Sequence, residues 1–265
     1  MPAKRAGKFT LATFNVNSVR SRLPVVLPWL ERHRPDVLCM QETKCRDAEF
    51  PAADFEKLGY QVAVHGQKSY NGVAIASRLP LETVGRGLED GEDGEPARLL
   101  RARVRGVSVV NTYVPQGREV GTEHFAYKLK WLARLRRFFE KRYAPDQQVL
   151  WCGDMNVAPA ELDLHDPAGN RDHVCFTAEV RAALAEVAAW GFQDLFRKHH
   201  PDPGQYSFYD YRVKDALKRG LGWRVDLIMA TAPLAAKSAD CWIDLVPRAA
   251  EKPSDHCPVL AEFEL

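Results

Sequence analysis

The chain has 265 residues, of which 46% are hydrophobic, so it can bury the core of one large domain or of two small ones. Lys and Arg total 37 and Asp and Glu total 35, so the formal net charge is only +2 and overall charge indicates no particular partner. No run approaches the roughly 20 apolar residues that a membrane-spanning helix needs, so we expect no membrane association.

The N-terminus and the cysteines indicate a cytoplasmic protein. Residues 1–8 are basic and no apolar stretch follows them, which predicts a short flexible terminus and not a secretory leader. The six cysteines form no Cys-x-x-Cys pair and lie mostly inside apolar runs, which predicts buried, reduced thiols and neither a zinc site nor a disulfide framework.

Short apolar runs rich in Val, Ile, Tyr and Phe recur along the chain and predict strands. In chain order they cover residues 11–16, 36–41, 60–64, 72–76, 99–104, 107–114, 149–152, 223–230, 239–246 and 258–263. Several of these runs follow one another with no helix between them, which argues against an all-parallel sheet. We therefore expect an α/β fold with two mixed sheets and helices outside.

Three stretches between the strands have helical spacing, at 18–33, 122–143 and 177–190. The second predicts an apolar inner face and a basic outer face made of Lys128, Lys130, Arg134, Arg136 and Arg137. The polar segments 88–96, 165–176 and 201–205 predict surface loops, and none is long enough to link two domains. We therefore expect a single domain over residues 9–265.

Polar or acidic side chains stand at the ends of several predicted strands. They are Asn15, Glu42, Tyr113, Asp154, Asn156, Asp226, Asp255 and His256. Strand ends that meet on one rim are where α/β folds build their sites. Carboxylates gathered there repel one another unless a cation joins them, and oxygen ligands favour Mg²⁺ or Mn²⁺ over zinc.

Each of these residues also has a structural interpretation. Residues 153–156 could form a turn, since Gly, Asp and Asn are typical turn residues. Asp226 could pair with Arg224 or Arg101, and Tyr113 could be an amphipathic core residue. Their joint occurrence, in order along the chain, favours a functional site.

Six segments in order resemble the motif series of the exonuclease III family of apurinic/apyrimidinic (AP) endonucleases. They are Phe-Asn-Val-Asn (14–17), Gln-Glu-Thr-Lys (41–44), Asn-x-Tyr-x-Pro-x-Gly (111–117), Gly-Asp-Met-Asn-Val-Ala-Pro (153–159), Gly-Trp-Arg-Val-Asp (222–226) and Ser-Asp-His-Cys-Pro (254–258). The resemblance covers about residues 9–265. It implies the four-layer α/β sandwich of the endonuclease/exonuclease/phosphatase superfamily, with two mixed β-sheets flanked by helices, and a Mg²⁺-dependent phosphodiesterase that acts on damaged DNA.

The resemblance implies a metal site in which Glu42 is the principal ligand of Mg²⁺, with Mn²⁺ as a substitute. Asn15 and Asp255 support Glu42, and Asn17 assists from behind the ligands. A second site would use Asp154, Asn156 and His256, so the number of metals stays open.

The resemblance also implies catalytic roles. Asp154 would orient or deprotonate the attacking water, and Asn156 would stabilise the charge that develops on phosphorus. His256 would contact the scissile phosphate, with Asp226 holding its ring, and Tyr113 would donate to a phosphate oxygen or act as a phenolate. The general base stays open among the Asp, the His and the Tyr.

Basic and polar groups near the motifs predict a DNA-binding surface, because contacts to phosphate need only such donors. Those predicted to bind DNA are Arg20, Arg22, Lys44, Lys68, Tyr70, Asn71, Arg118, Lys128, Lys130 and Arg212. Residues 66–72 resemble a DNA-contacting loop of the family. The run 134–137 is interpreted instead as a solvated face.

An abasic nucleotide costs less to extrude than an intact one, so a tight aromatic pocket could select it. The resemblance places the pocket walls at Phe208 and Trp223, while Tyr206 and Tyr211 fit a pocket or a core equally well. His165, in the loop 161–173, stands where family members can carry an Arg that reaches across the DNA. A bulky residue there could instead block extrusion and favour trimming of 3′ ends.

These features predict a monomeric enzyme that acts on double-stranded DNA with abasic sites or blocked 3′ ends. It would incise 5′ to abasic sites and carry 3′-phosphodiesterase, 3′-phosphatase and 3′→5′ exodeoxyribonuclease activity in open proportion. The alternatives are a phosphoesterase of the same fold with another substrate, a 3′-trimming nuclease without incision at abasic sites, and a non-catalytic binding module.

Overall fold

The computed structural model describes residues 7–92 and 94–265, which form two six-stranded sheets. The first sheet contains, in spatial order, β11 (Ser238–Ile243), β12 (Val259–Glu264), β1 (Lys8–Asn15), β2 (Val37–Gln41), β4 (Val73–Ser77) and β3 (Gln61–His65). The second contains β5 (Glu82–Arg86), β6 (Leu99–Val104), β7 (Val107–Tyr113), β8 (Val149–Asp154), β10 (Asp226–Thr231) and β9 (Phe192–Asp194).

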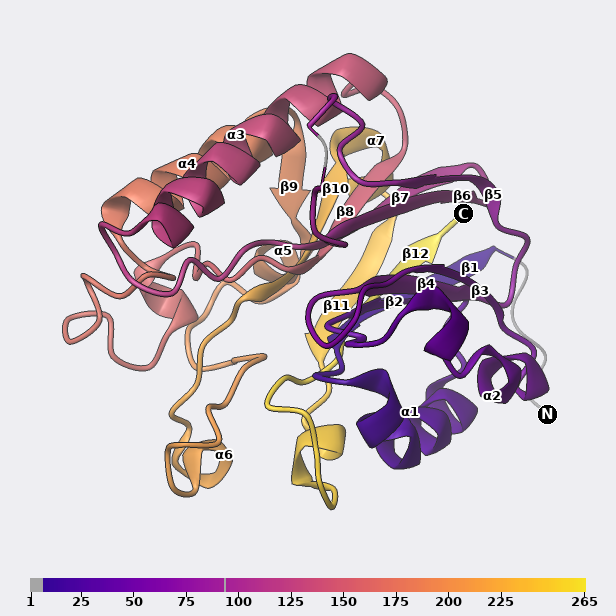
Figure 1. Ribbon diagram of the computed structural model, residues 1–265, viewed down its shortest axis with the longest axis horizontal. Coiled ribbons are helices and arrows are strands. Elements are labelled where there is room, and N and C mark those ends of the chain that lie inside the picture. The colour runs from indigo at the N-terminus through magenta and orange to yellow at the C-terminus, as the bar shows by residue number, and fades with distance from the viewer. Residues whose placement is uncertain (1–6, 93) are drawn as a thin grey trace.

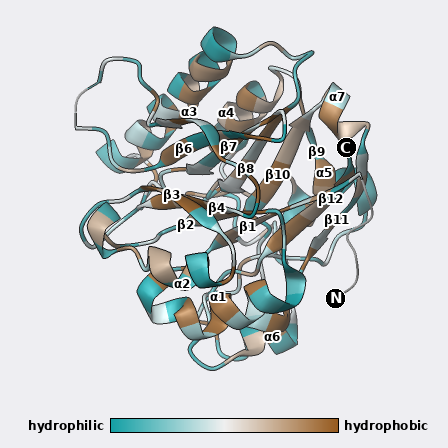
Figure 2. Cartoon of the chain, turned by 90° about the vertical axis from the view of Figure 1, so that its right-hand side faces the viewer, coloured by the Kyte–Doolittle hydropathy of each residue, from teal (hydrophilic) through white to brown (hydrophobic). Residues whose placement is uncertain are grey.

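Helices cover the outer face of each sheet, which gives the four-layer α/β sandwich (Figure 1). The first sheet is covered by α1 (Val19–His33) and α2 (Ala52–Lys57), and the second by α3 (Glu123–Arg142) and α4 (Ala178–Ala188). In Figure 2 these helices carry both hydrophobic and hydrophilic residues, as helices with one buried face should. The predicted fold class, two mixed sheets flanked by helices, is therefore confirmed.

Each sheet has one parallel pair, β1–β2 in the first and β7–β8 in the second. A parallel pair needs a long crossover, and α1 and α3 supply it. All the other pairs are antiparallel. Both parallel pairs end at the same edge of the sandwich, so the residues after β1, β2, β7 and β8 are brought together there.

The core between the sheets draws residues from both, including Leu11, Cys39, Val109 and Leu150. A shared core of this kind supports the prediction of a single domain over residues 9–265. The predicted flexible terminus lies mostly outside the described residues, but Lys8 does not belong to it. Lys8 is the first residue of β1, where it pairs with Glu264 and its ammonium contacts Glu262.

Several short elements escaped prediction. They are β5, β9, α2, α5 (Leu195–His199), α6 (Ala216–Arg219), α7 (Ala232–Ala235) and the 3₁₀ turns Asp47–Glu49, Glu161–Asp163 and Val246–Ala249. β5 is a largely exposed edge strand and β9 has three residues, so neither shows the periodicity of a buried strand. None of the helices in the described ranges is long and apolar enough to cross a membrane.

The prediction of a uniformly basic outer face on α3 is wrong at two positions. Lys128 and Arg134 are both buried. The Arg134 guanidinium donates to both carboxylate oxygens of Asp90 at 2.7 Å and also to Glu95, so these two acidic residues lie against α3 and bury the guanidinium. Lys130, by contrast, is exposed, as expected.

Candidate active site

The site lies at the sandwich edge where the two parallel strand pairs end. Asn15 ends β1, and its Nδ2 donates to Glu42 Oε1 at 2.8 Å and to Asp154 Oδ2 at 2.9 Å. Glu42 follows β2 in the first sheet and Asp154 ends β8 in the second. One amide therefore ties the two sheets together through two carboxylates.

Three residues of the site have left-handed backbone conformations. Asn17, Glu42 and Asn156 have φ values of 44°, 51° and 48°. Residues other than glycine adopt this region at a cost, and such residues gather at functional sites where surrounding contacts hold them. Here the Glu42 carbonyl accepts from the Ser18 N–H at 2.8 Å, and the Asn156 N–H donates to Asp154 Oδ1 at 2.8 Å.

Glu42 is held as an anion by its neighbours. Its Oε2 lies 2.8 Å from the Lys44 ammonium, and its Oε1 accepts from Asn15. Burial acts to raise the pKa of Glu42, but Lys44 and the Asn15 amide outweigh it and lower the pKa. In this arrangement Lys44, predicted to bind DNA, supplies a positive charge directly beside the predicted metal ligand.

The other two predicted ligands of the metal occupy different places. Asp255 Oδ1 accepts from Asn17 Nδ2 at 2.9 Å, and Asn17 Oδ1 accepts from Lys44, so a chain of contacts links Asp255 to Glu42. Asn15 turns its Nδ2 to the carboxylates, while its Oδ1 accepts from the Asn17 N–H at 3.0 Å. Asn15 thus acts as a donor between carboxylates here, and its role as a ligand stays a prediction.

His256 is buried between two carboxylates. Its Nδ1 lies 2.8 Å from Asp226 Oδ2, and its Nε2 lies 3.8 Å from Asp154 Oδ2. Burial by itself would lower the pKa of His256, but Asp226 and Asp154 raise it to about 10. An imidazolium with Nδ1–H bonded to Asp226 therefore presents Nε2–H toward the centre of the site.

Asp226 contacts His256, which was one of its two predicted uses. The alternative partner Arg224 bonds instead to Asp163 and Asp194. Ser207, a residue that the sequence did not single out, donates its hydroxyl to Asp226 Oδ2 at 2.7 Å. Ser207 lies in a loop 19 residues before Asp226, so the local sequence gives no indication of this contact.

Burial raises the pKa of both Asp154 and Tyr113, but the consequence differs. Burial raises the pKa of Asp154, His256 lowers it and Asp226 raises it, with a result of about 7. A carboxylate of this kind can exchange a proton near neutral pH. Burial and the charges of Glu42 and Asp154 raise the pKa of Tyr113 well above 10, so Tyr113 keeps its hydroxyl proton and is available as a donor.

The donor set fits a divalent metal ion. Glu42, Asp154 and His256 each bring one atom to a cluster in which all three lie within 4.8 Å of one another, although the protonated ring of His256 has no lone pair for a metal. Two of them are carboxylate oxygens, the ligand type that Mg²⁺ and Mn²⁺ prefer. The three residues come from both predicted metal sites, which the structure thus brings next to each other.

A cleft of about 770 Å³ opens above these groups. Phe208 and Trp223, the predicted pocket walls, both line it. The Phe208 ring lies 4.9 Å from the His256 ring, and the Trp223 ring lies 4.7 Å from that of His173. Tyr206 is buried beneath the cleft, and Tyr211 lies outside it with its hydroxyl on the Pro253 carbonyl.

His165 lines the cleft and is anchored to its far wall. Its Nδ1 lies 3.2 Å from the Gly222 carbonyl, and its backbone N–H donates to the same oxygen. The loop that carries His165 is therefore pinned to the residue before Trp223. Gln116, Asn170 and His173 also line the cleft, and sequence reasoning assigned them no role.

The predicted DNA-binding residues fall into two groups. Those at the surface are Arg20, Lys68, Tyr70 and Arg118, and Arg118 also lines the cleft together with Arg212. Asn71 is half-buried, and its carbonyl accepts from the Lys44 N–H. Arg22 bonds to the Tyr211 hydroxyl and the Pro253 carbonyl, which leaves its predicted contact with DNA a prediction.

Lys128 does not belong to the DNA-binding surface. Its ammonium is buried and donates to the carbonyls of Gln116 at 3.1 Å, Asn156 at 2.7 Å and Val174 at 3.0 Å. These carbonyls come from three loops that wall the cleft. The helical spacing placed Lys128 on the basic face, but the loops fold over that end of α3 and use its charge internally.

The chain is similar to known proteins over nearly its whole length. A family model described as the endonuclease/exonuclease/phosphatase family matches residues 12–256. Exodeoxyribonuclease III of Haemophilus influenzae is 34% identical over 264 residues, which cover 95% of this chain and 98% of the relative.

Two solved structures are similar over nearly the whole chain. An AP endonuclease from Archaeoglobus fulgidus has a TM-score of 0.95 and 51% identity, covering 97% of this chain and 100% of its own. A 3′ phosphatase, NExo, from Neisseria bound to a product DNA hairpin has a TM-score of 0.92 and 36% identity, with the same coverage.

Proposed function

Since the chain belongs to the endonuclease/exonuclease/phosphatase family and is a nuclease of the exodeoxyribonuclease III and AP endonuclease type, we propose that it is a Mg²⁺-dependent DNA repair enzyme that cleaves the backbone 5′ to abasic sites. The observation that carries this proposal is the buried Asp226–His256 pair beside Asp154, at the floor of a cleft walled by Phe208 and Trp223.

The reaction is hydrolysis of a phosphodiester. A water oxygen bonds to phosphorus, the bond from phosphorus to the 3′ oxygen breaks, and that oxygen takes a proton from solvent to leave as the 3′ hydroxyl. Asp154, with its pKa near 7, accepts the water proton. His256 Nε2–H and the Tyr113 hydroxyl donate to the phosphate oxygens, where negative charge develops. Asn156 Nδ2 donates to the Val114 carbonyl at 3.0 Å and to Asp154 Oδ2 at 3.3 Å, so Asn156 holds the base in place.

We propose that Glu42 and Asp255 hold a Mg²⁺ ion, for which Mn²⁺ can substitute, and that Asp154 faces it. When bound, the ion would neutralise charge on the phosphate and on the leaving oxygen and would lower the pKa of a coordinated water. Asn15 and Lys44 keep Glu42 ionised and oriented for that task. Chelation with EDTA should abolish cleavage, and Mg²⁺ should restore it.

Substrate choice follows from the shape of the cleft. An extruded abasic sugar fits between Phe208 and Trp223, whereas an intact nucleotide costs more to extrude. We propose that four groups bind the duplex backbone. They are Arg118 and Arg212, which line the cleft, and Lys68 and Tyr70, which are exposed at the surface. A monomeric state and a cytoplasmic location belong to the same proposal, and the six free, buried thiols support the location.

The test is a duplex with one internal tetrahydrofuran site, compared with the undamaged duplex and with inositol phosphates, all with Mg²⁺. We expect a single cut 5′ to the tetrahydrofuran. His256→Ala should reduce kcat by about 100-fold or more, the usual range for a lost acid–base or charge-stabilising group. His199→Ala is the matched control, since His199 contacts Ser238 away from the cleft. Cleavage of inositol phosphates alone would refute the proposal.

A second candidate function, 3′-end trimming with little incision at abasic sites, is favoured by His165. This side chain enters the cleft and is anchored to Gly222, where it would narrow the space for an extruded sugar. The Neisseria relative is described as a 3′ phosphatase and as a 3′–5′ exonuclease. A panel of an internal abasic site, a 3′-phosphate, a 3′-phosphoglycolate and a recessed 3′ end separates the two functions.

His165→Gly sharpens that comparison. If His165 limits extrusion, the variant should incise the abasic duplex about tenfold faster relative to its 3′-phosphatase rate, corresponding to about 1.4 kcal/mol in the activation barrier. An unchanged ratio would show that His165 does not set the balance. Asp166→Asn, one residue further along the same loop and outside the cleft lining, serves as control.

A further inference from the structure

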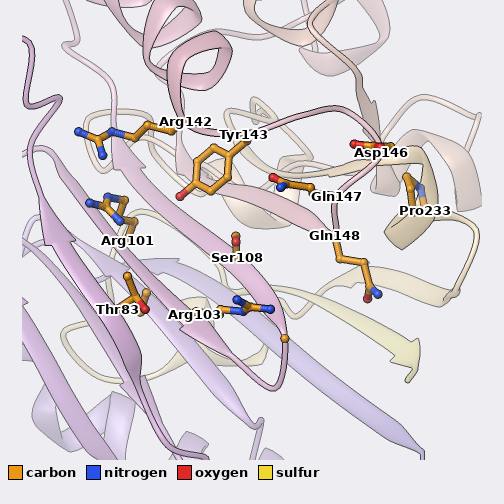
Figure 3. Close-up of a pocket in the computed structure, with 12 residues that line it drawn as sticks. Thr83, Arg101, Arg103, Ser108, Arg142, Tyr143, Asp146, Gln147, Gln148 and Pro233 are labelled. Atoms are coloured by element: carbon orange, nitrogen blue, oxygen red, sulfur yellow. The ribbon is translucent and has the colours of Figure 1, made fainter.

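A second hollow, of about 540 Å³, lies on the outer face of the second sheet (Figure 3). Its walls come from β5, β6, β7 and the segment that follows α3, and they include Arg101, Arg103, Ser108, Arg142 and Gln148. Ser108 and Gln148 stand at the starts of β7 and β8, whereas the catalytic groups stand at their ends. Tyr113 is five residues after Ser108 along β7, a distance of roughly 16 Å in a strand, so this hollow is distinct from the catalytic cleft.

Three arginines line the hollow, and acidic neighbours offset part of their charge, including Glu82, which stands opposite Arg103 in the pairing of β5 with β6. Glu89 accepts from Arg101 at 3.1 Å and also from Arg142, so one carboxylate serves two guanidinium groups. Arg103 makes no ion pair with any residue that the structure describes. Asp146 is the one acid in the lining, and Figure 3 shows it beside Pro233, across the hollow from Arg101 and Arg142.

The strands make room for Arg101. A Cβ atom at Gly85 would lie 2.4 Å from its Cζ, so the guanidinium rests directly on the glycine of the neighbouring strand. Its Nε–H is buried and has no hydrogen-bond partner among the described residues. This Nε–H is packed against Gly85 and closed to the hollow, so an anion there would contact the guanidinium through its terminal nitrogens.

Neutral donors complete the lining. Thr83, Ser108 and Gln148 bring hydroxyl and amide groups, and Tyr143 points its hydroxyl toward Arg101 in Figure 3. Several guanidinium groups with such donors suit the many acceptor oxygens of a phosphate group. The volume is that of a small-ligand site.

We propose that this hollow is an anion site for the phosphate group of a small molecule, such as a nucleoside monophosphate or inorganic phosphate. The site is independent of the proposed nuclease function. Arg103 and Arg101 would contact the phosphate, with Ser108 and Gln148 as neutral donors. Arg142, which shares the Glu89 carboxylate with Arg101, would add positive charge near the phosphate.

Calorimetric titration of the full chain tests the site, with inorganic phosphate and deoxyadenosine monophosphate as probes and EDTA present. Loss of one charge-assisted contact in Arg103→Gln should weaken binding about tenfold. Gly85→Ala should weaken it as well, because the new methyl displaces the Arg101 guanidinium while net charge is kept. Arg137→Gln, an exposed change on α3 outside the lining, is the matched control.

His256→Ala separates this hollow from the catalytic cleft. Binding should persist in that variant, and Arg103→Gln should cleave abasic duplex at the wild-type rate. Tighter binding of the nucleotide than of inorganic phosphate would identify a nucleotide site, and equal binding a simple phosphate site. Binding that is lost in His256→Ala but unchanged in Arg103→Gln and Gly85→Ala would overturn the proposal. Binding of an undamaged duplex, but of neither small probe, would overturn it as well.

Discussion

His256 shows how a single buried group can be set by its neighbours. The ring lies between Asp226, at 2.8 Å, and Asp154, at 3.8 Å, and these carboxylates outweigh burial to raise the pKa of His256 to about 10. The imidazole therefore stays protonated through neutral pH and can donate to a phosphate. Removing one of the two carboxylate charges should lower that pKa toward its ordinary value.

Asp226→Asn should add a loss of activity with rising pH to the pH dependence that Asp154, with a pKa of about 7, already gives the wild type. The sign follows from the raised pKa: the protonated ring is present below the folded-state pKa and is lost as pH rises through it. A lower pKa moves this loss to lower pH, so the ratio of kcat at pH 8 to kcat at pH 6 should be smaller in the variant than in the wild type. Where the ring is fully deprotonated, kcat should be up to about 100-fold below the wild-type value. Ser207→Ala, which keeps the charge of Asp226, should show a smaller change. Parallel profiles for wild type and Asp226→Asn would contradict this assignment.

Lys128 holds three loops of the cleft through a buried ammonium. Burial lowers the pKa of Lys128, while Cys175 and Asp154 raise it, and three carbonyls accept its protons. One of these carbonyls belongs to Asn156, so Lys128 contacts the backbone of a residue that is predicted to be catalytic.

Lys128→Met should therefore affect both stability and activity. The carbonyls would lose a charged donor, and we expect the free energy of unfolding to fall by about 2–3 kcal/mol. The shifted Asn156 should also reduce kcat more than it raises KM. Chemical unfolding and steady-state kinetics measure the two effects. Lys130→Met, an exposed change two residues further along α3, should leave both the free energy of unfolding and kcat unchanged. Equal effects in the two variants would refute the role of Lys128.

At the scale of elements, the acidic loop 88–96 is fastened to α3 by Arg134. The buried guanidinium takes Asp90 as a bidentate partner and also contacts Glu95, whose carboxylate accepts from the Tyr127 hydroxyl. Hydrogen bonding to Arg134 is the main cause that lowers the pKa of Asp90 to about 2. Charge contacts therefore add to the apolar contact of Leu88, which is buried in the core under α3.

This fastening predicts a pH-dependent contribution to stability. A lowered carboxyl pKa stabilises the fold fully above the ordinary value of 3.8, and this contribution is lost as pH falls toward about 2. Asp90→Asn should lower the free energy of unfolding at pH 7 by about 1 kcal/mol, since Asp90 is partly exposed. The difference from wild type should shrink when urea unfolding is repeated at pH 3. Asp202→Asn, at an exposed position, is the control, and a difference that is constant with pH would contradict the linkage.

At the scale of the whole molecule, the sandwich buries every thiol. All six cysteines are free and buried, and three of them, Cys39, Cys152 and Cys241, lie in the core between the sheets. Reaction of these thiols with an aromatic disulfide reagent therefore requires opening of the fold.

The native protein should react with such a reagent slower than the unfolded chain by a factor on the order of 10³ or more, given ordinary domain stability. Time courses in buffer and in guanidinium chloride measure the ratio. All six thiols should become reactive over one unfolding transition if the sheets unfold together. One or more thiols that react rapidly in native buffer would contradict the shared core.

The sequence by itself determined most of the element types and predicted the polar residues that the structure gathers at one edge of the sandwich. Strands such as β7 and β12 and the amphipathic α4 follow from local periodicity, which depends only on neighbouring residues. Asn15, Glu42 and Asp154 could be found because each stands at a strand end within a specific motif. The exposed β5 and the three-residue β9 lack that periodicity, so only pairing with β6 and β10 makes them strands.

Only the tertiary structure decided which polar groups meet. Lys128 and Arg134 lie on the helix face that spacing predicts to be exposed, yet loops from elsewhere in the chain bury them. Ser207 reaches Asp226 from a distant segment, and Glu42 and Asp154 approach each other because two sheets pack face to face. Burial and charge pairing depend on residues far apart in the chain, and local sequence does not contain that information.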